Sequence, residues 1–149
     1  MHAPDRSTPH VSVRSRRIGL AVTALAALFL LMDGVMKFSK NPAVVQGTAQ
    51  LGWNPALAPT LGIIALVCLT LYLVPRTSVL GAILLTGYLG GAVATHVRVG
   101  NPLFTHILFP TYLGALLWGG LWLRDARVRA LFARTAAPDG QSGVVGKAA

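Results

Sequence analysis

The most constraining feature of the sequence is its third apolar segment, from Thr77 to Val97, which holds 21 residues and no formal charge. As an α-helix it would rise about 30 Å, which matches the hydrocarbon core of a bilayer. The whole chain is 54% apolar and only 11% charged, whereas a soluble domain carries about 25% charged residues. The sequence therefore predicts a protein that spans a membrane.

Four such segments predict an all-α fold: a polytopic four-transmembrane-helix bundle with a short interfacial helix in the first outer loop. Asn41-Pro42, Asn54-Pro55 and Asn101-Pro102 each favour a helix start, with a side-chain acceptor before a residue of preset φ. The predicted spans cover residues 17–37, 55–74, 77–97 and 103–123. The bundle is expected over 16–124, between a basic disordered tail at 1–15 and a basic, amphipathic or disordered tail at 125–149.

Pro110 lies inside the fourth predicted span. Its ring lacks an N–H donor and displaces the carbonyl group four residues earlier, which belongs to His106. A kink beside His106 is therefore predicted.

The distribution of Lys and Arg predicts the orientation. Ten of the 13 basic residues lie in the two tails and the tight turn at Arg76, and the other connections hold only Lys37, Lys40 and Arg98. The positive-inside rule then places both termini in the cytoplasm. Because the basic residues flank apolar spans, the net charge of +9 indicates anionic lipids at the cytoplasmic face and no nucleic-acid partner.

Five ionisable residues are expected at one depth, at the outer ends of the first, third and fourth spans: Asp33, Lys37, His96, Arg98 and His106. They could line a ligand-binding pocket roofed by the connection from Phe38 to Trp53, with Asp33 facing the bundle. They could instead form an incidental belt facing water, in which Asp33 and Lys37 snorkel as an ion pair. The sequence leaves both interpretations open.

Other residues limit the chemistry. His96 and His106 favour a hydrogen bond to a ligand carbonyl over haem or metal ligation, because no third ligand is evident. The lone Cys68 excludes an intrachain disulfide, and no catalytic constellation specifies a reaction. The stripe formed by Gly87, Gly91 and Thr95 is typical of close helix packing, either within the bundle or across a homodimer.

Several segments resemble the DoxX-like family of small bacterial four-span membrane proteins: Leu31–Phe38 (LMDGVMKF), Leu51–Pro55 (LGWNP), Tyr72–Gly100, Phe109–Pro110 and Trp118–Asp125. The resemblance covers about residues 17–134, and the GGAVATH run is its most specific part. Many relatives carry an acidic residue in the middle of the second span, where this chain has Ala65 between apolar neighbours.

The resemblance implies a multi-pass protein of the bacterial plasma (inner) membrane. It also implies an accessory subunit that interacts with a quinone or lipid and with a membrane redox partner. A small-solute transporter and a purely structural subunit are the alternatives. No residue of the chain carries the redox expectation, which rests on the family alone.

Overall fold

The computed structural model describes residues 12–135, in which every regular element is helical. The long helices are α1 (Val13–Met36), α3 (Ala58–Leu73), α4 (Ser78–Arg98) and α5 (Phe109–Arg124), and the shorter ones are α2 (Pro42–Gln50) and α6 (Ala126–Thr135). A 3₁₀ turn, η1 (Pro55–Leu57), precedes α3, and a π-helical turn, η2 (Leu103–Ile107), precedes α5. The outer parts of the two expected tails, at 1–11 and 136–149, lie outside the described residues.

Four helical segments are long and apolar enough to cross a bilayer: Val13–Met36, Pro55–Leu73, Ser78–Arg98 and Leu103–Arg124. The four-span, all-α prediction is confirmed. The first span begins four residues earlier than expected, because the Ser12 hydroxyl accepts the backbone N–H of Ser15 and caps the helix at Val13.

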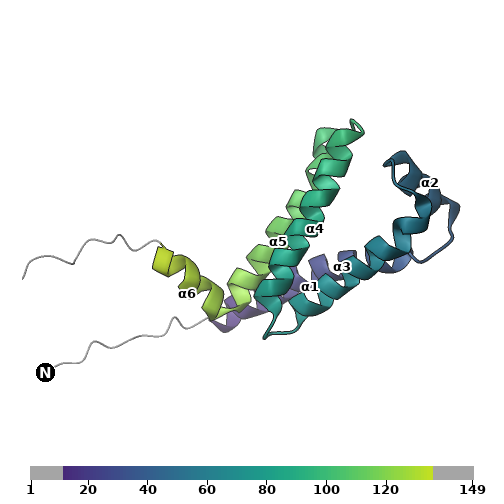
Figure 1. Ribbon diagram of the computed structural model, residues 1–149. Coiled ribbons are helices and arrows are strands. Elements are labelled where there is room, and N and C mark those ends of the chain that lie inside the picture. The colour runs from purple at the N-terminus through teal and green to yellow at the C-terminus, as the bar shows by residue number, and fades with distance from the viewer. Residues whose placement is uncertain (1–11, 136–149) are drawn as a thin grey trace, which may run out of the picture.

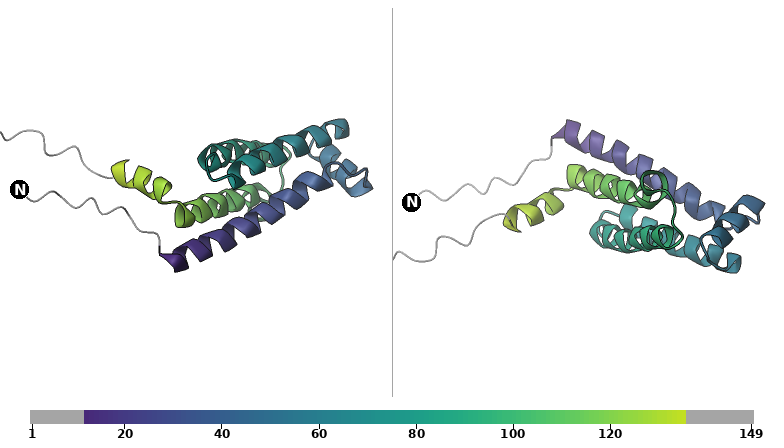
Figure 2. Two further views of the ribbon diagram at one scale, coloured as in Figure 1. Left: turned by 90° about the horizontal axis from the view of Figure 1, so that it is seen from below. Right: turned by 90° about the horizontal axis from the view of Figure 1, so that it is seen from above.

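The long helices form two antiparallel pairs, α1 with α3 and α4 with α5, and α1 also packs against α5 while α3 packs against α4. The pairs converge where α1 begins and α5 ends, which we term the termini end (Figure 1). They diverge toward the opposite end, which we term the loop end, where α2 lies beside α3. Seen from below and above, α5 lies beside α1 and α4 lies beside α3 (Figure 2).

Tyr72 anchors the core at the termini end. Its side chain is fully buried, and its hydroxyl donates a hydrogen bond to the backbone carbonyl of Leu117 at 2.8 Å and lies 3.4 Å from the Thr23 hydroxyl. Since these residues belong to α3, α5 and α1, one phenol links three helices. Polar groups within a bilayer have no water to bind and must form hydrogen bonds inside the protein. The Tyr72 hydroxyl therefore helps to hold α1, α3 and α5 together at the termini end.

Glycines allow α1 to approach both of its neighbours. A Cβ atom at Gly120 would lie 2.6 Å from the Thr23 hydroxyl oxygen, and one at Gly62 would lie 2.8 Å from the Gly34 carbonyl oxygen. Neither distance leaves room for a side chain. The crossings of α1 with α5 and with α3 therefore depend on glycine, as is common where helices pack in lipid.

The three Asn-Pro signals have different outcomes. Asn41 and Asn54 each accept a backbone N–H two residues on, at the starts of α2 and η1, as predicted. Asn101 does not cap, and that prediction is wrong: its amide turns back to the ring of His96 instead. The fourth span is broken, as predicted, with η2 ending at Ile107 and α5 beginning at Phe109.

Candidate functional site

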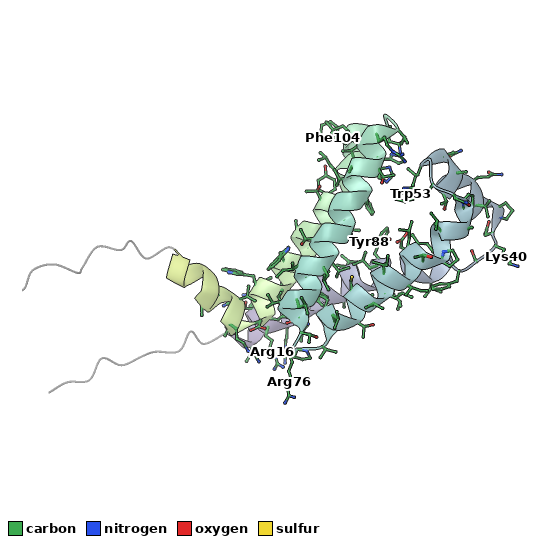
Figure 3. All side chains as sticks on the ribbon, viewed as in Figure 1. Arg16, Lys40, Trp53, Arg76, Tyr88 and Phe104 are labelled. Carbon is green, nitrogen blue, oxygen red and sulfur yellow. The ribbon has the colours of Figure 1, made fainter. Side chains whose placement is uncertain are left out.

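A cavity of about 410 Å³ lies where the two helix pairs diverge. Residues of α1, α4 and α5 line it, together with residues from α2 to the first turns of α3. Tyr88 extends from α4 toward the space between the pairs, and Trp53 lies in the same space on the α2 side (Figure 3). Thr48, Leu51 and Trp53, from the connection expected as a roof, are among the lining residues.

The lining of this cavity is divided by polarity. Its apolar part includes Phe29, Leu30, Leu61, Leu89, Phe109 and Leu113. The rings of Phe29 and Phe109 meet edge to face, with centroids 5.0 Å apart, and join α1 to α5 there. Its polar side chains include Asp33, Lys37, Thr48, Tyr88, Thr95 and His96, most of them near the loop end. Such a cavity suits an amphiphile with a polar head and an apolar body.

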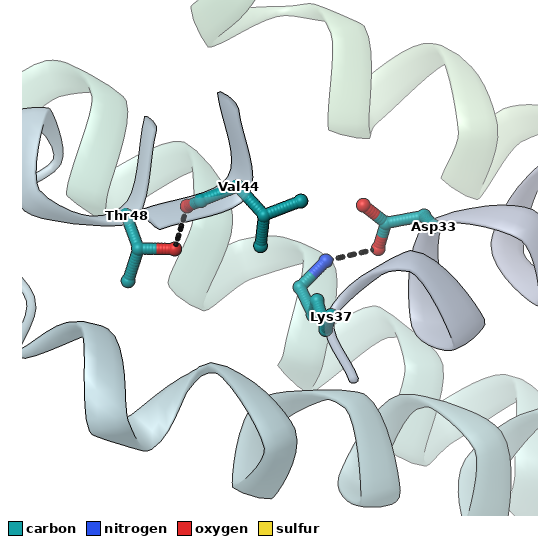
Figure 4. Close-up of polar contacts among 4 residues, drawn as sticks. All are labelled: Asp33, Lys37, Val44 and Thr48. Atoms are coloured by element: carbon teal, nitrogen blue, oxygen red, sulfur yellow. Dashed lines mark hydrogen bonds and ion pairs between the residues drawn. The ribbon is translucent and has the colours of Figure 1, made fainter. Parts of the chain in front are cut away.

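Asp33, in the last turn of α1, forms an ion pair with Lys37, the residue that follows α1 (Figure 4). Both side chains are partly exposed, and both line the cavity. The predicted pair is confirmed, and it faces the cavity. Because the charges neutralise each other, the pair gives the polar end a strong dipole but no net charge.

His96 is held in place from both sides. The Asn101 amide nitrogen donates to its Nδ1 at 2.8 Å, and the ring of His106 packs edge to face with a centroid distance of 5.8 Å. An imidazole that accepts at Nδ1 carries its proton on Nε2, so His96 keeps an N–H donor. His106 is exposed and does not line the cavity, and its Nδ1 pairs with the Thr105 hydroxyl.

Arg98 is not itself a lining residue, but it binds one, Leu51, at the loop-end edge of the cavity, which we term the mouth. Its guanidinium donates to the backbone carbonyl of Leu51 at 2.7 Å, which ties the end of α4 to the connection between α2 and η1. Gly52 follows with φ of +73°, and a Cβ there would come within 2.9 Å of the guanidinium. Asp33, Lys37 and His96 thus line the cavity, Arg98 closes its rim, and His106 supports His96 from outside.

The stripe of Gly87, Gly91 and Thr95 also lines the cavity. No atom of another helix lies within 4 Å of a Cβ built at Gly87 or Gly91, so neither glycine makes a close helix contact within the described chain. These glycines instead widen the cavity. Packing of the stripe against a second copy stays a prediction.

Tyr88 and Trp53 are lining residues that sequence analysis did not select as site residues. Helical spacing could have found Tyr88, which precedes Thr95 by seven residues and therefore shares its face of α4. Nothing in the sequence near Trp53 distinguishes a ring that turns toward a cavity from one at the head-group level.

The described residues contain no group of three or more His, Cys, Asp or Glu side chains that could hold a metal ion. Cys68 is buried in the core and lies apart from the cavity. The arrangement can bind and orient a ligand through hydrogen-bond donors and a neutral ion pair.

The model of the DoxX-like family matches residues 21–120, about two thirds of the chain. The chain belongs to the DoxX-like family. Comparison with curated proteins and comparison with solved structures each gave no match. Every residue that lines the cavity falls within the range matched to the DoxX-like family. Ala65, where the resemblance implies an acidic residue in relatives, is fully buried among the helices.

Proposed function

We propose that this DoxX-like membrane protein binds a neutral lipophilic molecule with a polar ring, of the quinone type, in the cavity between its helix pairs. It would do so as an accessory subunit of a membrane redox system. The observation that carries the proposal is the cavity itself, with apolar walls, an Asp33–Lys37 ion pair and a fixed His96 donor.

The size and lining of the cavity support a ligand of this class. Its volume of about 410 Å³ falls within the range of about 300–1,000 Å³ found for small-molecule sites. That volume accommodates a ring and the first part of a chain. The rest of the chain would extend along the apolar lining, away from the polar groups at the loop end.

The polar groups support a neutral head with carbonyl acceptors. His96 offers an Nε2–H, and the phenol of Tyr88 also lines the cavity. An anionic head would gain little, because Asp33 already neutralises the nearby Lys37. Carbonyl oxygens of a quinone would accept these hydrogen bonds without adding charge to an apolar site.

We propose the bacterial inner membrane as the location, with both termini in the cytoplasm. The cavity would then open in the outer leaflet, and the arginine-rich termini end would face anionic lipid head groups on the inner side. The redox association rests on the family resemblance.

The test is to isolate the full-length protein in mild detergent, extract it with organic solvent and identify retained lipophiles by mass spectrometry. We expect a quinone-type molecule in the wild type and about tenfold less in His96→Ala, since one hydrogen bond to the head is lost. Lys40→Ala is the control, because the Lys40 side chain is exposed and does not line the cavity, and it should retain the ligand. Equal retention by both variants, or bulk phospholipid alone, would overturn the proposal.

The redox association needs a separate test, because a ligand could be bound without it. Cross-linking of the protein in native membranes, followed by mass spectrometry, should recover a partner that contains a redox cofactor. Recovery of partners without such a cofactor would leave a ligand-binding protein with a purely structural role.

A further inference from the structure

We infer that the arginines at the termini end form a binding surface for the phosphate groups of anionic phospholipids, built from α1, the α3–α4 turn, α5 and α6. This surface lies at the opposite end from the cavity, and the inference does not depend on the ligand proposed there. The arginines of this end whose side chains the structure describes are Arg14, Arg16, Arg17, Arg76, Arg124, Arg127 and Arg129. Figure 3 labels Arg16 and Arg76, which come from α1 and from the α3–α4 turn and both belong to the termini end.

Two of these arginines hold the surface together. Arg124 of α5 donates to the Tyr72 carbonyl at 3.1 Å, and its guanidinium lies 5.0 Å from the centre of the Tyr72 ring. Arg129 of α6 donates to the Trp122 and Leu123 carbonyls and to the Ser15 hydroxyl. These contacts join α1, α3, α5 and α6, so the surface is a fixed part of the fold.

The other arginines at this end are exposed and have no acidic partner in the described range. Asp125 is the only acidic residue described here, and its carboxylate accepts the backbone N–H of Arg127. The single ion pair found in residues 12–135 joins Asp33 and Lys37, at the loop end. The positive charge of Arg16, Arg17 and Arg76 is therefore not neutralised within the described chain.

The positive charges of Arg16 and Arg17 lie near a helix N-terminus, where they destabilise the helix unless an anion from outside the chain binds them. Both lie at the start of α1, where the helix dipole is positive and no acidic residue is present in the first turn. Arg16 precedes Thr23 by seven residues, so it lies on the face of α1 that packs toward α5. Arg16 therefore lies on the side of α1 that faces the end of α5, where Arg124 lies.

The surroundings identify the source of the phosphate as lipid. Ile18, Leu20 and Trp122 lie beside these arginines and are about half exposed, as suits side chains in contact with acyl chains. Arg129 stacks on the Trp122 ring at 4.8 Å, an arrangement that belongs at the interface of a membrane. A phosphodiester at this depth would meet guanidinium groups, which bind it in a bidentate way.

The test uses the full-length protein in nanodiscs that contain equal amounts of phosphatidylglycerol and phosphatidylcholine. The composition of the lipid that remains bound after transfer to mild detergent is measured by mass spectrometry. We expect phosphatidylglycerol to be enriched in the wild type, and each removed arginine to lower that enrichment about fivefold. Arg16→Gln/Arg17→Gln/Arg76→Gln should lose it, and 1 M salt should weaken it in the wild type.

Lys40→Gln is the matched control for Arg76→Gln, because each removes one exposed positive charge from a connection, at opposite ends of the bundle. The inference requires a loss with Arg76→Gln and none with Lys40→Gln. Equal enrichment in the wild type and the triple variant, or equal losses in the two single variants, would overturn it. Displacement of the lipid by millimolar inorganic phosphate would also overturn it, since the site would then select the ion and not the lipid. Retention of the cavity ligand by the triple variant is a separate readout that reports only on the proposed function.

Discussion

The guanidinium of Arg98, the last residue of α4, donates a hydrogen bond to the backbone carbonyl of Leu51 across the mouth of the cavity. Among the described residues, this is the one side-chain hydrogen bond that joins the two helix pairs at the loop end. The other side-chain hydrogen bonds between the pairs lie at the termini end and include those of Tyr72, Arg124 and Arg129.

Loss of this hydrogen bond should loosen the mouth without unfolding the protein. With spin labels at Val45 and Leu103, which are both exposed, we expect Arg98→Ala to broaden the distance distribution. Lys40→Ala removes an exposed charge from the same end and should leave the distribution unchanged. Identical distributions in Arg98→Ala and the wild type would show that the contact does not hold the mouth.

Gly52 and Gly100 provide a matched pair for the same contact. Both have positive φ, +73° and +70°, so alanine at either position should cost about 1–2 kcal/mol of stability. Only at Gly52 would the added methyl group meet Arg98, because a Cβ at Gly100 has open space. Gly52→Ala should therefore broaden the spin-label distances and Gly100→Ala should not. The same broadening in both variants would attribute the effect to backbone strain.

The Tyr72 hydroxyl offers a test of the core. Tyr72→Phe removes the hydrogen bond to Leu117 while keeping the buried ring, so we expect a loss of about 1 kcal/mol in the free energy of unfolding. Denaturation in mixed micelles measures this loss. Tyr112→Phe, at a half-exposed position, should have no effect, and a comparable loss there would argue against a special role for the buried hydroxyl.

Substitution by leucine should destabilise the protein at a glycine that contacts a neighbouring helix but not at a glycine that lines the cavity. Gly120→Leu forces a side chain against Thr23 and should destabilise the bundle by about 1–3 kcal/mol or prevent folding. Gly91→Leu projects into the cavity and should leave the unfolding free energy nearly unchanged. Sedimentation in detergent checks the homodimer interpretation of the stripe, since Gly91→Leu would then convert dimer to monomer.

The fold could be predicted because span boundaries follow from local signals. Charged residues end the apolar runs, Asn41 and Asn54 cap as their spacing indicates, and Pro110 breaks the fourth span. Asn101 shows the limit of such signals. At Asn101-Pro102 the asparagine amide lies near the His96 imidazole. Its hydrogen bond to that ring replaces the helix cap.

The candidate site could be predicted only in part. Helical spacing brought Asp33, Lys37 and His96 to one end, since all three lie near helix ends at that depth. Spacing selected Gly87 and Gly91, which recur every fourth residue but line the cavity. The glycines that contact a neighbouring helix, such as Gly62 and Gly120, have no glycine four residues away. The difference arises from the divergence of the helix pairs, which depends on how α1 packs against two neighbours at once.

The most direct test of the account is native mass spectrometry of the full-length protein released from membrane nanodiscs. The wild type should carry an adduct with the mass of one neutral lipophilic ligand. The folded variant Gly87→Leu/Gly91→Leu should lack it, because its side chains fill the cavity. An adduct of the same mass and occupancy in both proteins would show that the ligand binds elsewhere and would contradict the account.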